Sequence, residues 1–143
     1  MGRELLVEII AGKNGPLTDD TLPRVLEELY ALGIKPDWWK LEPQASAAAW
    51  QKIEATIARN DPWCRGVVLL GLEAPQQELE AAFAATANAP IVKGFAVGRT
   101  IFNEAAEEWI AGRMSDEAAI ADMAGRFERL TKAWLAARGQ KAA

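Results

Sequence analysis

The sequence contains no histidine among its 143 residues. This absence excludes Ser-His-Asp and Cys-His catalysis, histidine metal sites and histidine general bases. Cysteine occurs once, as Cys64, so an intrachain disulfide and a thiolate zinc cluster are excluded as well. Any catalysis would therefore rest on Lys, Glu, Asp, Arg, backbone groups or a bound cofactor.

Basic residues are too few for a nucleic-acid binder. The chain has 16 Lys and Arg against 20 Asp and Glu, a formal net charge of −4. No apolar run approaches the roughly 18 residues of a membrane span, and the start Met-Gly-Arg-Glu is too polar for a signal peptide. We therefore expect a cytoplasmic protein without nucleic-acid or membrane partners.

Short apolar runs alternate with segments of helical periodicity along the chain. The runs are bounded by Gly, Pro or Asn and predict buried strands at 5–10, 37–42, 66–71 and 91–97. Helices are predicted between the strands: the first follows Thr18-Asp19-Asp20, which supplies an N-cap residue, Ser46 can cap the second, and Pro75 suits the first turn of the third. Two more helices follow at 103–111 and 116–138. This order predicts a parallel α/β sheet with right-handed crossovers and a frayed tail at 139–143.

Two parallel architectures fit this order, an open doubly wound sheet and a (β/α) barrel. With no obvious linker, we expect one domain spanning 1–143. A barrel of the TIM type needs eight strands, and this chain supplies four. A barrel would then be completed by a second copy, giving a homodimer, or by the rest of a longer protein.

Charged residues interrupt the predicted strands. Glu8 lies inside the first strand, and Lys40 and Glu42 lie on one face of the second. A lysine in an apolar site favours the neutral amine, which can attack a ketone to form a Schiff base, and a carboxylate can carry the protons. The alternatives are a buried ion pair that only joins the strands, or solvated edge positions. By parity, Trp38 shares the face of Lys40 and could wall a site.

Glycine-containing turns follow the last two predicted strands. Gly71 ends the third strand, and Gly98 and Arg99 follow the fourth. A strand-to-helix turn offers N–H groups to an anion, and an arginine adds a bidentate phosphate contact. The alternative is a tight turn with a surface arginine.

Three segments resemble the second half of a class I aldolase barrel. They are Leu-Val-Glu-Ile-Ile at 6–10, Trp-Lys-Leu-Glu-Pro at 39–43 and Gly-Phe-Ala-Val-Gly-Arg-Thr-Ile-Phe at 94–102. They are similar to motifs of the tagatose-1,6-bisphosphate aldolases. The run at 33–44 looks closer still to the aldolase-like domain fused to the C-terminus of some bacterial 5-dehydro-2-deoxygluconokinases of myo-inositol catabolism.

The resemblance makes these four strands the last four of a (β/α)8 barrel with an extra C-terminal helix. It makes Lys40 the Schiff-base lysine and Glu8 the proton carrier. It places Gly98 and Arg99 at the phosphate end of a sugar-phosphate substrate. The reaction it implies is carbon–carbon cleavage of phosphorylated 5-dehydro-2-deoxygluconate, with no metal or cofactor. The family's first four strands have no counterpart here, and Glu73 stands where tagatose-1,6-bisphosphate aldolases have a small-residue turn.

Three hypotheses follow. The first is an aldolase-type lyase that is incomplete as a single chain. The second is a non-catalytic sugar-phosphate binding or regulatory module, which needs Arg99 but not Lys40. The third is a half-barrel whose open edges bind a partner chain.

Overall fold

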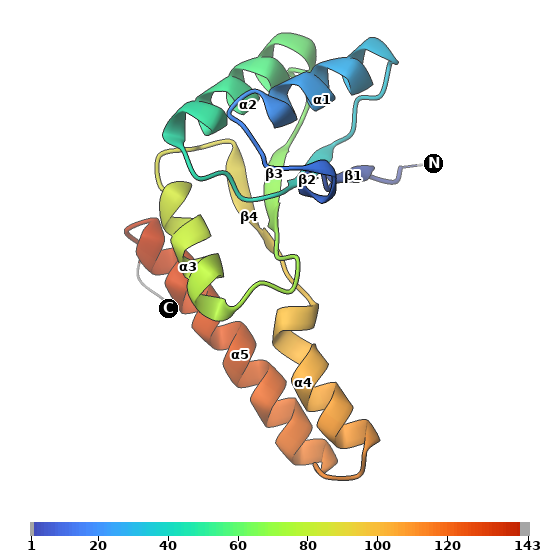
Figure 1. Ribbon diagram of the computed structural model, residues 1–143, viewed down its shortest axis with the longest axis vertical. Helices are drawn as coiled ribbons and strands as arrows, with labels where there is room; N and C mark the ends of the chain where they lie inside the picture. Colours follow the sequence, from blue (N-terminus) through green and yellow to red (C-terminus); the bar gives the residue numbers. More distant parts are fainter. Residues whose placement is uncertain (1, 141–143) are drawn as a thin grey trace. The chain divides into compact units, whose positions relative to one another are not determined.

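The computed structural model describes residues 2–140 and divides them into two compact units. The first unit comprises residues up to 70 together with 85–96, and the second comprises 71–84 and the residues from 97 onward. Figure 1 labels their helices and strands. The expectation of a single domain stays a prediction.

The first unit is built on a four-stranded parallel sheet in the order β1-β2-β3-β4. Its strands are β1 (Leu6–Ile9), β2 (Trp38–Leu41), β3 (Gly66–Leu70) and β4 (Val92–Ala96). All four predicted strands and their parallel pairing are confirmed. A doubly wound sheet reverses its strand order part-way, whereas this order runs consecutively from one edge to the other.

The two faces of the sheet differ in burial. One face carries Trp39, Leu41, Val67 and Leu69, which are all fully buried. The other face carries Glu8 and Lys40, which are register partners, with Val68 next to Lys40 and Gly94 next to Val68. These residues are partly or largely exposed, so one face is covered and the other is open.

Helices α1 (Thr21–Ala31) and α2 (Ala47–Asn60) pack together beside the buried face (Figure 1). Trp39 of the sheet donates its indole N–H to the Tyr30 hydroxyl of α1 at 2.8 Å, with the two rings edge to face. Ser46 accepts a hydrogen bond from the Ala49 N–H, so the predicted cap of α2 is confirmed. The predicted cap of α1 is different, because Asp20 at this position makes no capping hydrogen bond and pairs with Lys52 instead.

The loop after β1 contains a 3-10 helix over Gly12–Asn14, where the sequence indicated only a loop. This turn is closed by hydrogen bonds from Asn14 N to Ala11 O and from Gly15 N to Gly12 O. Gly15 has φ = 142°, a value that favours glycine. The turn brings two backbone N–H groups to Glu42, as described below.

The second unit is helical and contains α3 (Gln76–Ala85, whose last residue belongs to the first unit), α4 (Arg99–Ile110) and α5 (Asp116–Ala137). Helices α4 and α5 pack against each other, joined by a short turn. Helix α4 begins at Arg99 rather than near 103. Residues 139 and 140, part of the expected frayed tail, hydrogen-bond to the end of α5 through Gly139 N to Ala136 O and Gln140 N to Leu135 O. The remainder of that tail, 141–143, lies outside the described residues.

Candidate functional site

Lys40 and Glu8 form an ion pair on the open face of the sheet. Lys40 Nζ lies 3.1 Å from Glu8 Oε1, with side chains 22% and 39% exposed. The pairing follows from the parallel register, because Glu8 and Lys40 are directly opposite on β1 and β2. The pair is therefore partly desolvated but still open to a small molecule.

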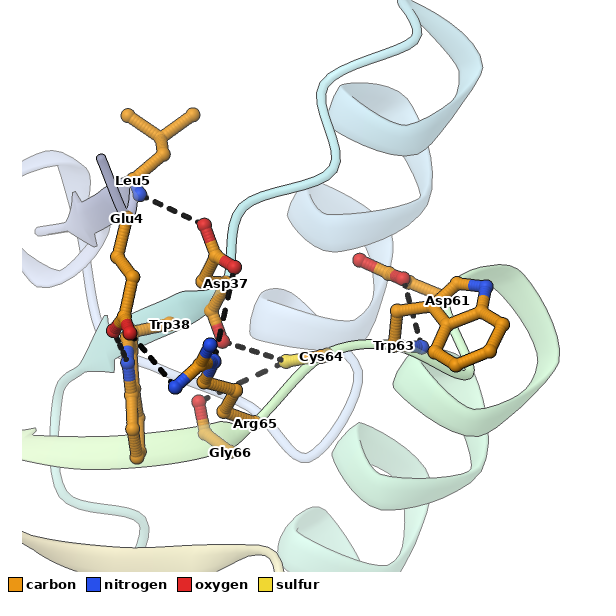
Figure 2. A network of polar contacts seen from close by, with 9 residues as sticks. All are labelled: Glu4, Leu5, Asp37, Trp38, Asp61, Trp63, Cys64, Arg65 and Gly66. Atoms are coloured by element: carbon orange, nitrogen blue, oxygen red, sulfur yellow. Dashed lines mark hydrogen bonds and ion pairs between the residues drawn. The ribbon is translucent and has the colours of Figure 1, made fainter. Parts of the chain in front are cut away.

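Trp38 lies on the same face as Lys40, one pleat toward the amino end of β2. Its indole N–H donates to Glu4 Oε2 at 2.7 Å, and Glu4 also pairs with Arg65 at 2.7 Å. Asp37 accepts the Leu5 N–H at 2.9 Å (Figure 2). This network fixes the indole at the amino end of the sheet, and its predicted role in walling a substrate site stays a prediction.

Glu42 follows β2 and is almost completely buried, with 3% of its surface exposed. Its carboxylate accepts the Ala11 N–H at 2.7 Å and the Gly12 N–H at 3.0 and 3.2 Å. A Cβ on Gly12 would lie 2.7 Å from Glu42 Oε1. The contacts of Glu42 are thus with the loop after β1, so it fixes that loop, and a contact with substrate stays a prediction.

The other predicted site residues lie in the second unit. Gly98 is the N-cap residue of α4, and Arg99 is the first residue of that helix. No side chain caps this N-terminus, and Arg99 instead pairs with Glu73. A Cβ on Gly71 would approach Val97 Cγ2 to 2.9 Å, so this glycine permits close packing.

Comparison with protein families matches residues 1–138 of this chain to one family model. That family is described as "Uncharacterized protein conserved in bacteria (DUF2090)". The chain belongs to the DUF2090 family. A comparison with curated proteins gave no match.

One phenol and one thiol in the first unit of this DUF2090 protein have raised pKa values. Burial raises the pKa of Tyr30 to about 12, although the Trp39 N–H it accepts acts in the opposite direction. Burial also raises the pKa of Cys64, whose Sγ lies 3.7 Å from the carbonyl oxygens of Asp37 and Gly66 (Figure 2). Cys64 is therefore a poor nucleophile.

Within residues 2–140 of this DUF2090 protein, no three Cys, Asp or Glu side chains lie close enough together to hold a metal ion. None of the helices over the same residues is both long and apolar enough to cross a membrane.

Sequence reasoning missed a set of polar residues in the second unit. Arg126 and Arg129 of α5 line a cleft that also includes Arg99 and Asn103 of α4. Leu72 and Glu73, before α3, have φ = 50° and 62°, in the left-handed region that non-glycine residues rarely adopt. The only sequence signal was the repeated arginine on one helix, which is ordinary for a solvated face.

Proposed function

We propose that this chain supplies four βα units of a (β/α)8 barrel, with the open face of its sheet forming part of the interior. The consecutive parallel order and the confinement of α1 and α2 to one face support this architecture. In such barrels the helices form the outer ring, and strand side chains fill the interior. Because eight strands are needed, closure takes four more βα units, from a second copy or from another part of a longer chain.

The proposed activity is that of a class I aldolase, with Lys40 as the Schiff-base nucleophile and Glu8 as the proton carrier. The observation that carries the proposal is the 3.1 Å contact between Lys40 Nζ and Glu8 Oε1 on the open face. A lysine at this place can reach a ketone, and a carboxylate in contact with its amine can accept and return a proton.

The reaction proceeds in balanced steps. Lys40 Nζ gives a proton to Glu8 and attacks the ketone carbon of the substrate as the amine, and the carbinolamine loses water to give a protonated imine, with Glu8 carrying the protons. The imine withdraws the electron pair of the neighbouring carbon–carbon bond as that bond breaks. The hydroxyl proton leaves to a carboxylate, and an aldehyde departs. Protonation of the remaining enamine and addition of water release the second product and restore Lys40.

The substrate class comes from the resemblance described above. It favours a phosphorylated keto-sugar acid such as 5-dehydro-2-deoxygluconate 6-phosphate, cleaved in the cytoplasm to dihydroxyacetone phosphate and malonate semialdehyde. This places the activity in carbohydrate catabolism, specifically of myo-inositol. The DUF2090 match covers the segments that carry the resemblance.

Borohydride trapping tests the Schiff base. The protein is incubated with dihydroxyacetone phosphate and reduced, and its intact mass and peptides are measured. We expect one adduct on Lys40, absent from Lys40→Met and retained in Lys52→Met, a control on α2 where Lys52 pairs with Asp20. The absence of an adduct on the folded wild type, or its persistence in Lys40→Met, would overturn the proposal.

A second candidate function is a sugar-phosphate binding module. It is favoured by Arg99 at the first position of α4, because the N–H groups of a helix N-terminus and an arginine guanidinium both bind anions. Calorimetric titration separates the two functions. Arg99→Ala should abolish sugar-phosphate binding in the module, whereas Lys40→Met should leave binding unchanged.

A further inference from the structure

A cleft of about 330 Å³ opens in the second unit, lined by the start of α3, the first half of α4 and the middle of α5. Its volume lies at the lower end of the range for small-molecule sites. Its charged wall consists of Arg99, Arg126, Arg129, Glu73 and Glu104. Three cations against two anions leave this wall with a net positive charge.

The three arginines differ in how many hydrogen bonds and ion pairs their guanidinium groups already make with the protein. Arg126 is held by Asp122 at 2.5 Å and by Glu104 at 2.7 Å, so its donors are committed to the protein. Within residues 2–140, Arg129 donates one hydrogen bond, to the amide oxygen of Gln76 at 3.3 Å, and the neighbouring carboxylate of Glu128, on which its charge acts, is paired with Lys132. Arg129 can therefore offer donors to a ligand.

Arg99 is occupied by Glu73, but this contact is easily exchanged. Both side chains are more than half exposed, at 59% and 51%, and exposed ion pairs contribute little to stability. Glu73 also holds its backbone at φ = 62°, next to Leu72 at φ = 50°, which is costly for residues other than glycine. A phosphate brings more charge than a carboxylate and can take two parallel hydrogen bonds from an arginine.

We infer that this cleft binds a phosphate monoester held by Arg99 and Arg129, and that Glu73 is the internal anion that the phosphate displaces. This inference rests on the second candidate function, since both use Arg99. It adds Glu73 as a gate, meaning a carboxylate that leaves Arg99 when the ligand binds, and Arg129 as a second arm, meaning a second cationic side chain that holds the phosphate. The ligand enters as Glu73 turns away from Arg99, so the empty cleft keeps its arginine paired. No contact with Lys40 is required.

Titration of the whole chain with glycerol 3-phosphate tests the inference, because this monoester has no carbonyl group and cannot form an imine. Glycerol serves as the uncharged comparison, and the ionic strength is held constant. We expect saturable binding of the phosphate ester. Glu73→Gln should tighten binding roughly fivefold or more by removing the competing carboxylate. Arg129→Gln should weaken it roughly tenfold by removing a charged hydrogen bond.

The matched control is the pair of Glu108 and Arg113 in α4 and the turn that follows it. These residues form two hydrogen bonds of 2.7 Å outside the cleft, so Glu108→Gln and Arg113→Gln should leave the affinity unchanged. If Glu73→Gln does not fold, Glu73→Gly removes the same carboxylate and suits the left-handed backbone.

The outcomes separate the gate from the phosphate site. If Arg99→Gln abolishes binding but the Glu73 and Arg129 variants bind like the wild type, the gate and the second arm are wrong while the binding module stands. If neither the wild type nor Glu73→Gln binds the ester saturably, both are overturned. The borohydride trapping of Lys40 does not depend on whether the cleft binds the phosphate ester.

Discussion

Glu8 and Lys40 stand opposite each other on neighbouring parallel strands, with their charged ends in contact at 3.1 Å. On the covered face the same pair would carry a larger desolvation penalty. On the open face, the same contact leaves the amine accessible to a small molecule. This accessibility is what the proposed chemical role of Lys40 requires.

Replacing Glu8 by Gln tests that role. The variant keeps the size of the side chain but cannot accept a proton, so we expect imine formation at Lys40 to slow by roughly 10²–10⁴-fold. The rate is measured from the borohydride-trapped fraction against time. Glu4→Gln, which alters a carboxylate at the amino end of the sheet, is the control. Equal rates for Glu8→Gln and the wild type would show that Glu8 carries no proton.

Replacing Gly12 by Ala tests the loop that Glu42 holds. The new Cβ would lie 2.7 Å from Glu42 Oε1, so the loop or the carboxylate must move. We expect a loss of about 1–3 kcal/mol in the free energy of unfolding, measured by urea titration. Gly94→Ala is the control, since no heavy atom lies within 4 Å of its Cβ position. If the Gly12→Ala protein is as stable as the wild type, the Glu42 carboxylate does not lie close against Gly12 as described.

Tyr30 should titrate well above the ordinary range. It is the only tyrosine in the chain, so tyrosinate absorbance reports this group alone. Burial raises its pKa to about 12, whereas an unfolded tyrosine titrates near ~10. The folded state therefore holds the phenol proton more tightly. The resulting stability is fully present below pH ~10 and is lost as the pH rises toward 12. A titration midpoint near ~10 in the folded protein would contradict this.

Cys64 should react slowly with alkylating reagents at mildly alkaline pH. Burial raises its thiol pKa, so less of the reactive thiolate is present in the folded protein than in the unfolded chain. Iodoacetamide labelling, followed by intact mass, should be slower in buffer than in concentrated urea. Labelling at the same rate in both solvents would show that the thiol is exposed.

The main features of the sheet could be predicted from sequence because local patterns determine them. Apolar runs marked the strands, and alternation allowed Glu8 of β1 to share a face with Lys40 of β2; the parallel register makes the two residues partners. Alternation also placed Glu42 near them, but its partners are N–H groups of a 3-10 turn. The hydrogen bonds of such a turn depend on tertiary contacts that no periodicity records.

The second unit was harder to predict for a similar reason. Helix α4 was expected to begin after Arg99, because Gly98 and Arg99 are typical of a loop, yet the helix begins at Arg99 itself. The cleft combines side chains from three helices separated by many residues. Leu72 and Glu73 carry no turn signal, since positive φ normally calls for glycine or asparagine.

The consecutive order of the four strands has a consequence for where ligands can bind. Open α/β sheets usually hold ligands in a crevice outside the carboxyl ends of their strands, where successive connections diverge to opposite faces. An order of β1-β2-β3-β4 contains no such divergence. Barrels with consecutive strands instead bind ligands at the loops that follow the carboxyl ends of the strands, and Lys40 is the last residue but one of β2.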